Sequence, residues 1–174
     1  MSAILKIVLP FILLFGISSE DNIQNNIVKE TTTYYFIRHA EKDRSDKSEK
    51  DPNLTAEGLK RAQIWAEVLK DIPLDMVLST NYKRTLQTGV PIAGSKQLSM
   101  ENYNAGNGYN DEFRKRTSGK RVLVVGHSNT TPQFVNEILG EDKYADIDDT
   151  ENGALFIVQI LPNNEILDQV LYIN

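Results

Sequence analysis

The chain has 174 residues, which is enough for one domain with a full hydrophobic core. Hydrophobic residues make up 40% and charged residues 25%, a composition typical of a globular protein rather than a disordered or fibrous one. The net charge of −5 argues against nucleic acid or an anionic membrane as the main partner, and the lack of cysteine excludes disulfides, a thiol nucleophile and thiolate metal ligands.

The first 18 residues have the layout of a secretory signal peptide. A short start with one lysine precedes an apolar run at 7–17, and small residues follow. The run is shorter than the ~20 residues of a membrane-spanning helix. We therefore predict export to the periplasm or the extracellular space, with cleavage after Ser18 or Ser19 and no stable membrane span afterwards. The alternatives are an uncleaved N-terminus that tethers the protein to a membrane and a first helix of the domain, which Pro10 disfavours.

Residues 19–32 form a polar lead-in, and the domain is predicted to span residues 33–174. Within it, short apolar runs alternate with segments of helical period, as in α/β domains with a largely parallel sheet. Buried strands are predicted at 33–37 and 121–125, and weaker strands at 75–78 and 97–103. The runs at 155–161 and 166–173 are joined by the turn sequence PNNE and predict a hairpin.

Helices are predicted between these strands. Apolar residues recur at helical spacing over 56–70, where Thr55 suits the N-cap. Asn81 and Thr130 are the predicted caps of two further helices, over 82–93 and 131–139, with Pro132 tolerated in the first turn of the latter. A charged loop is expected at 43–53 and a flexible loop at 104–110.

The two histidines of the chain both follow predicted buried strands. In an open parallel sheet, ligands bind beyond the carboxyl ends of the strands, where Arg38-His39, the segment 79–84 and His127 would emerge together. Two histidines with Arg38 and Arg84 combine permanent positive charge with groups that exchange protons or attack a substrate near neutral pH. Phosphate fits this set, because arginine binds its oxygens in pairs and nearby helix starts add N–H donors.

Each of these residues also has a structural interpretation. Either histidine alone could be a hydrogen-bonded residue at a sheet end, Arg84 could lie on a solvated helix face, and Glu41 with Lys42 could form a surface pair. A two-histidine metal site would need carboxylates to complete it, because the chain has no third histidine, no cysteine and no H-E-x-x-H motif.

Four stretches, "IRHAEK", "LTAEGLKRA", "LSTNYKRTLQT" and "VLVVGHSNT", occur in an order and context that resembles the histidine phosphatase superfamily, also called phosphoglycerate mutase-like. The resemblance runs from about residue 34 to the final hairpin and is greatest to small SixA-like and "HAEK" bacterial members. It implies an α/β three-layer sandwich with a mostly parallel central sheet. It also implies a phosphatase that needs no metal or other cofactor and takes a small phosphorylated substrate.

The resemblance assigns roles to the four charged or titratable residues. His39 would be the nucleophile and form a phosphohistidine that water hydrolyses, Arg38 and Arg84 would hold the phosphoryl oxygens, and His127 would hydrogen-bond the phosphoryl group. An attacking imidazole must be neutral at the reacting nitrogen, so we expect a loop carbonyl to fix the other nitrogen. Residues expected around the pocket, with a packing or capping role as the alternative, are Thr85, Ser128 and Asn129.

The general acid is where the chain departs from the family pattern. Many members place Asp or Glu between the second helix and the second histidine to protonate the leaving oxygen. That region reads "QLSMENYNAGNGYNDEF", in which Glu101 is the positional candidate and Asn104 could equally stand at the acid position. Glu41 is the other candidate, as acid or as a substrate contact, and some small members work without a dedicated acid. Ala40 also replaces the glycine that many members carry.

Only 42 residues separate Arg84 from His127, so there is little chain for a large lid. This spacing favours a small open pocket and disfavours a true mutase, which must retain its substrate. The leading hypothesis is an exported, metal-independent phosphomonoesterase that uses His39. The alternatives are a catalytically weak or inactive phosphate-binding or interaction module on the same fold, and a metal hydrolase.

Overall fold

The computed structural model describes residues 30–173. The predicted signal peptide at 1–18 and nearly all of the lead-in at 19–32 lie outside the described residues, so export stays a prediction. No helix within residues 30–173 is long and apolar enough to cross a membrane. Six strands occur in this range, namely β1 (Thr32–Arg38), β2 (Met76–Ser79), β3 (Met100–Asn102), β4 (Arg121–Gly126), β5 (Ala154–Ile160) and β6 (Ile166–Tyr172).

The strands form one sheet with the order β3-β2-β4-β1-β5-β6. The four strands from β3 to β1 are parallel to one another, whereas β5 pairs antiparallel with β1, and β6 pairs antiparallel with β5. The predicted mostly parallel sheet and the predicted hairpin are both confirmed. Within the parallel part, β1, β2 and β4 are short and almost fully buried, as expected for strands covered on both faces, whereas the edge strand β3 is mostly exposed.

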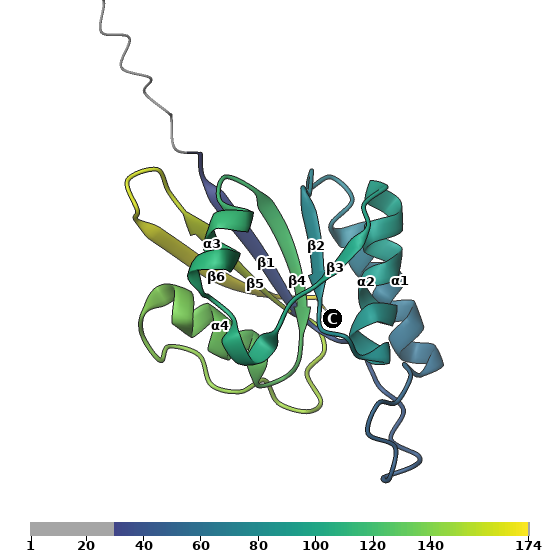
Figure 1. The fold of residues 1–174 in the computed structure, drawn as a ribbon. Helices are drawn as coiled ribbons and strands as arrows, with labels where there is room; N and C mark the ends of the chain where they lie inside the picture. Colours follow the sequence, from purple (N-terminus) through teal and green to yellow (C-terminus); the bar gives the residue numbers. More distant parts are fainter. Residues whose placement is uncertain (1–29, 174) are drawn as a thin grey trace, which may run out of the picture.

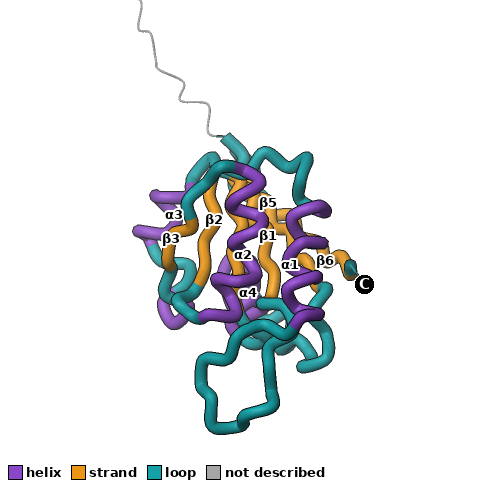
Figure 2. Tube along the Cα trace, turned by 90° about the vertical axis from the view of Figure 1, so that its right-hand side faces the viewer, coloured by secondary structure: helices purple, strands orange, loops and turns teal. Residues whose placement is uncertain are grey.

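Helices cover both faces of the sheet, which confirms the predicted three-layer sandwich (Figures 1 and 2). On one face, α1 (Ala56–Val68) and α2 (Lys83–Lys96) pack over a cluster that contains Trp65 and Ile92. On the other face, α3 (Asp111–Thr117) and α4 (Thr130–Leu139) cover an aromatic cluster that contains Tyr34, Phe36 and Phe134.

The pairing of β1 with β4 places the two histidines side by side. In this parallel register Arg38 lies opposite Gly126, and the backbone N–H of His39 donates to the Gly126 carbonyl at 2.9 Å. Each histidine follows its strand directly. His39 and His127 therefore leave the sheet at the same edge, although they are far apart in sequence.

The start of α1 packs against the chain just beyond His39. Thr55 caps the helix as predicted, because its hydroxyl accepts from the Gly58 N–H at 3.0 Å, and its own backbone N–H donates to the Glu41 carbonyl at 2.9 Å. A Cβ atom on Gly58 would lie 2.2 Å from that carbonyl oxygen. Only glycine therefore allows the helix to approach the segment after the histidine this closely.

The predicted caps at Asn81 and Thr130 are wrong. Tyr82 precedes α2 and forms no side-chain cap, and the carboxylate of Asp51 instead accepts from the Lys83 N–H at 2.9 Å. Thr130 already belongs to α4, and its hydroxyl accepts from the His127 N–H at 3.2 Å. The cap of α2 is thus supplied from the charged loop at 43–53, a tertiary contact that local sequence does not reveal.

The region between α2 and β4 also differs from the prediction. The expected strand at 97–103 is reduced to β3, because Gln97 ends α2 in a left-handed conformation with φ of 56°. The expected flexible loop at 104–110 contains the 3-10 turn η1 (Ala105–Asn107). It ends at the start of α3, whose N-cap Asn110 accepts from the Phe113 N–H at 2.8 Å. At seven residues, α3 is too short to produce a clear helical period.

We expect Gly58→Ala to lower the free energy of unfolding by about 1 to 3 kcal/mol. The added methyl group would overlap backbone atoms of Glu41, and backbone cannot rotate aside as a flexible side chain can. Gly94→Ala is the matched control. Gly94 lies in α2, and no atom lies within 4 Å of the place that an added methyl group would occupy, so alanine there should raise stability by about 0.5 to 1 kcal/mol. Urea unfolding of both variants measures the two changes. Equal effects of the two substitutions would contradict this account of the helix contact.

Candidate active site

The two histidine rings face each other at the carboxyl end of the parallel strands. Their centroids are 5.6 Å apart and their planes are inclined by 67°. His39 lies deeper, with 3% of its surface exposed, whereas His127 is partly exposed. The predicted convergence of the β1 and β4 ends is confirmed.

His39 is held in one tautomer by its neighbour. Its Nδ1 lies 2.7 Å from the Ala40 carbonyl oxygen, so Nδ1 carries the proton and donates it, and Nε2 keeps its lone pair. The carbonyl that the sequence analysis expected is therefore present. The Ala40 N–H in turn donates to the Thr88 hydroxyl at 2.9 Å, and this hydroxyl donates to the Arg84 carbonyl at 2.8 Å. Helix α2 thus fixes the backbone that orients His39.

Both imidazoles are held neutral. Burial is the main cause that lowers the pKa of His39 to about 3, and the positive charges of Arg38 and Arg84 lower it further against the effect of the Ala40 carbonyl. Burial likewise lowers the pKa of His127 to about 4, with Arg84 and Lys42 adding to the shift. A neutral His39 with a free Nε2 lone pair is a nucleophile near neutral pH.

Arg38 reaches the loop before β5. Its Nη1 donates to the carbonyls of Asp148 and Glu151 at 2.7 and 3.0 Å, and its Nη2 contacts the Asp149 carboxylate at 2.9 Å. Asp149 also binds Arg44 at 3.2 Å. The guanidinium of Arg38 is almost fully buried, and burial lowers its pKa. These contacts fix the guanidinium plane, and they leave Nε without a partner.

Arg84 extends from the first turn of α2 over the ring of Tyr82, with its Cζ 4.4 Å from the ring centroid. The same ring packs edge-on against His127, with centroids 5.1 Å apart. Nη2 of Arg84 lies 3.4 Å from Nδ1 of His127, and Nη1 lies 3.5 Å from the carboxylate of Asp51. Tyr82 thus packs against two of the predicted site residues at once.

His127 is oriented by the segment after β2. Its Nε2 lies 3.0 Å from the hydroxyl of Thr80, which contacts the Thr85 hydroxyl at 3.0 Å. Thr85 is fully buried and also hydrogen-bonds the Thr80 carbonyl. Thr85 therefore has a packing and positioning role behind His127, rather than a place at the pocket surface.

The arginines present donors that the protein itself does not use. Nε of Arg38 and both Nε and Nη1 of Arg84 are buried without a hydrogen-bond partner within the described part of the chain. Lys42 is half-buried nearby, and its pKa is lowered by burial and then by the charges of Arg44 and Arg84. Buried donors need a partner, and cations of this kind suit an oxyanion such as a phosphoryl group.

A cavity of about 660 Å³ opens beside His127 and Arg84. Its walls come from the segment after β2, the segment after β3 and the start of α4, and among the described residues no Asp or Glu lines it. The predicted residues Ser128 and Asn129 lie in the wall. Asn104 lies there too, capping η1 through its side-chain oxygen. The other lining residues are Thr80, Asn81, Tyr82, Tyr103, Ala105, Gly106 and Thr130.

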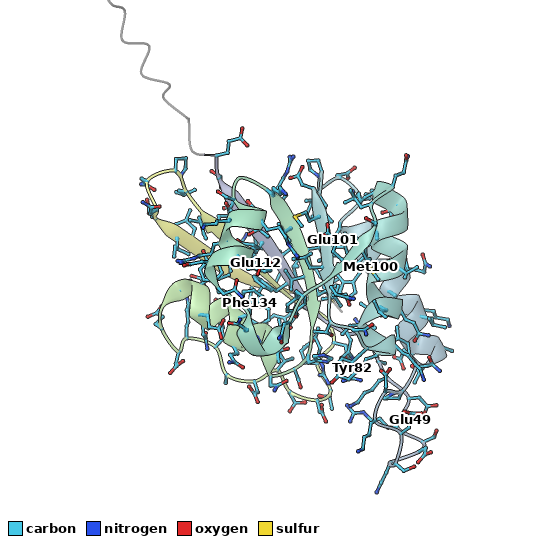
Figure 3. The ribbon with its side chains drawn as sticks, viewed as in Figure 1. Glu49, Tyr82, Met100, Glu101, Glu112 and Phe134 are labelled. Carbon is cyan, nitrogen blue, oxygen red and sulfur yellow. The ribbon has the colours of Figure 1, made fainter. Side chains whose placement is uncertain are left out.

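The two candidate acids are not brought to this cavity. Glu101 lies on β3, and its carboxylate is 4.0 Å from Arg116 of α3 (Figure 3). In the same view Glu101 sits well above Tyr82, away from the lower edge of the sheet. Glu41 binds Arg61 of α1 at 2.6 Å. Of the acid-position candidates, the structure places only Asn104 in the cavity wall.

Several residues of the site were missed by sequence reasoning. Thr88 could have been found, because it lies one helical turn after Arg84 and therefore on the same face of α2. Tyr82 lies inside a recognised motif without an assigned role. Asp149 and Asp51 carry no such signal, because they reach the arginines from loops distant in sequence. No group of three or more His, Asp or Glu with the arrangement of a metal site occurs in residues 30–173.

Comparison with protein families agrees with this geometry. Residues 34–105 match the model of the histidine phosphatase superfamily, branch 1. The matched range contains Arg38, His39 and Arg84, and it ends before His127. No curated protein matches the chain significantly.

Solved structures share the fold. A putative phosphohistidine phosphatase SixA from Agrobacterium tumefaciens is 22% identical, with a TM-score of 0.57 over 78% of this chain and 97% of its own. The protein histidine phosphatase SixA complexed with tungstate is 19% identical, with a TM-score of 0.64 over 80% and 96%. A putative alpha-ribazole-5'-P phosphatase from Escherichia coli is 17% identical, with a TM-score of 0.64 over 82% and 96%.

At these identities the solved structures show the fold alone. The segment that matches the family model holds the Arg38-His39 pair, Arg84 and Thr88, which are the residues that build the surroundings of His39 in this structure. This segment is therefore similar to the histidine phosphatase superfamily, branch 1, and the chain has the fold of SixA-like phosphohistidine phosphatases.

Proposed function

We propose that the protein hydrolyses a small phosphorylated substrate without a metal ion, through a phosphohistidine on His39. The observation that carries this proposal is the neutral, buried His39 with a free Nε2, set beside buried guanidinium donors that have no protein partner.

In the first step, Nε2 of His39 attacks phosphorus, the P–Nε2 bond forms, and the bond to the leaving group breaks. The free donors of Arg38 and Arg84 bind the phosphoryl oxygens, and their positive charge stabilises the charge spread over those oxygens in the transition state. The Ala40 carbonyl stabilises the positive charge that develops on the ring through the Nδ1–H. Water then attacks phosphorus, the P–Nε2 bond breaks, and inorganic phosphate leaves. The attacking water loses a proton to the phosphate or to solvent, and His39 returns to its neutral form.

His39 and Arg38 do not line the cavity beside His127, and we expect the leaving group to lie in this cavity and to depart without a proton donor. Asn104 lies in the wall, and no carboxylic acid lines the cavity among the described residues. An amide does not donate a proton as a carboxylic acid does, so an alkoxide would be a poor leaving group here. Substrates with a P–N bond, as in phosphohistidine, or with a stabilised oxyanion suit this site better. The structural similarity to SixA proteins supports this substrate class.

We expect His39→Ala to lower turnover of an aryl phosphate about a thousandfold or more, because it removes the nucleophile. Rapid quench with a ³²P-labelled substrate should trap acid-labile label on His39 of the native protein, and treatment with a chelator should not change this labelling. His127→Gln is the control, because it keeps the nucleophile and should still become labelled at a reduced rate.

The opposite results would select the alternatives. Phosphate or vanadate binding without label or turnover would favour an inactive binding module. Activity lost to the chelator and restored by a divalent ion would favour a metal hydrolase.

We expect no histidine ionisation in kcat/KM between pH 5 and 8, after correction for ionisation of the substrate. The free enzyme holds His39 and His127 neutral, with pKa values near 3 and 4, so both stay unprotonated in this range. In the unfolded chain both imidazoles have the ordinary histidine pKa of about 6.5, so they take up protons as pH falls below that value. The free energy of unfolding should therefore fall as pH drops from 6.5 towards 4. Imidazole NMR titration measures both pKa values, and a value near 6.5 for His39 would contradict the burial argument.

We expect kcat/KM to fall steeply across a series of aryl phosphates as the pKa of the leaving phenol rises, because no acid protonates it. Asn104→Asp places a carboxylic acid in the cavity wall. In this variant kcat/KM should depend less steeply on the pKa of the leaving phenol. Turnover of an alkyl phosphate at acidic pH should rise by at least about tenfold. Asn102→Asp makes the same charge change on β3, outside the cavity. It should change neither the leaving-group dependence nor the turnover of the alkyl phosphate. A shallow dependence in the native protein would overturn the leaving-group proposal while leaving the role of His39 intact.

A further inference from the structure

Among residues 30–173, strand β6 is a free edge of the sheet. It pairs with β5 on one side, and Figure 2 shows it beyond α1 at the margin of the molecule. The Leu161 N–H donates to the Glu165 carbonyl, and the Ile173 N–H donates to the Gly153 carbonyl, so odd-numbered residues of this strand exchange hydrogen bonds with β5. The residues that direct their backbone groups away from the sheet are therefore Ile166, Asp168, Val170 and Tyr172.

This edge lacks the features that normally prevent strand pairing. Exposed edges are usually protected by lysine, proline, a bulge or an inward-pointing charge. The sequence of β6, "ILDQVLY", has neither lysine nor proline, and its register with β5 is continuous over all seven residues. Its only charge, Asp168, is neutralised within the subunit by Lys143 at 2.8 Å and by the Tyr144 hydroxyl.

The same strand exposes apolar side chains on the face of the sheet that carries α1. Leu167 and Leu171 are 44% and 43% exposed and lie on this face, on either side of Gln169. A shallow cavity of about 180 Å³ lies beside them, floored by Ile157 and Gln159 of β5. Neither helix α1 nor α2 extends over β6 in Figure 2.

We propose that the protein forms a homodimer in which β6 pairs antiparallel with β6 of a second copy, about a two-fold axis at Gln169. In this register the four residues whose backbone groups point away from β5 pair with one another across the interface, Ile166 with Tyr172 and Asp168 with Val170. Leu167 lies opposite Leu171 of the second copy, and Asp168 lies opposite Val170. The strand is thus complementary to itself, as an interface with two-fold symmetry requires.

The alternative registers fit less well. Centring the axis on Asp168 places two carboxylates directly opposite each other, which is destabilising. Centring it on Val170 leaves Ile166 without a partner in the second strand. The Gln169 register avoids both costs and buries both leucines against their counterparts, which favours a second copy of this chain as the partner.

Sedimentation equilibrium of the full-length chain tests this proposal. We expect the native protein to be a dimer, and Leu171→Lys to weaken dimerisation about a hundredfold, because it places an unpaired charge at the interface twice. Val90→Lys is the matched control, since Val90 is 57% exposed on α2, away from β6, and this variant should remain dimeric. Thermal unfolding and aryl phosphate turnover check that each variant is folded.

The register itself is tested by combining two substitutions. Leu167→Lys with Leu171→Glu places opposite charges face to face at both ends of the pairing, so the double variant should dimerise better than either single variant. A native chain that stays monomeric would overturn the proposal. A dimer that Leu171→Lys leaves intact would also overturn it, because it would place the interface elsewhere.

Discussion

The hydrogen bond from the His39 N–H to the Gly126 carbonyl is the contact on which the site depends. It extends the parallel pairing of β1 with β4 one residue beyond the strands, so the two histidines leave the sheet together. Helix α2 follows β2 and helix α4 follows β4, and these two strands are parallel, so both helices begin at the same edge of the sheet. The arginine of α2 and the hydroxyls near α4 therefore arrive beside the imidazoles because of the sheet topology.

Burial then converts this arrangement into a reactive one. An imidazole in water is largely neutral only above its ordinary pKa, whereas His39 stays neutral well below that value because it is buried among positive charges. Placing several cations together is costly, and the protein offsets part of the cost with Asp149 at Arg38 and Asp51 at Arg84. The remaining unpaired donors are the ones that a phosphoryl group can satisfy.

The same arrangement limits the chemistry that the site performs well. The Ala40 carbonyl orients the ring of His39, the nearby arginines carry positive charge, and the cavity wall near His127 presents amides and hydroxyls. Glu41, the acidic residue nearest to His39 in sequence, binds Arg61 through Oε1, whereas its Oε2 is buried without a hydrogen-bond partner among residues 30–173. The contacts of Thr55 and Gly58 with the Glu41 carbonyl fix the backbone of Glu41 against the start of α1.

Local patterns in the sequence determined the buried strands, the longer helices and the position of the two histidines at the ends of β1 and β4, because hydrophobic periodicity and short motifs are properties of neighbouring residues. The bond from His39 to the next carbonyl was predictable for the same reason. Tertiary structure alone decided that Asp51 caps α2, that Asp149 holds Arg38, and that Asn104 rather than Glu101 reaches the cavity. Those outcomes depend on which side of a short strand a residue points to and where distant loops return, and neither is encoded in spacing along the chain.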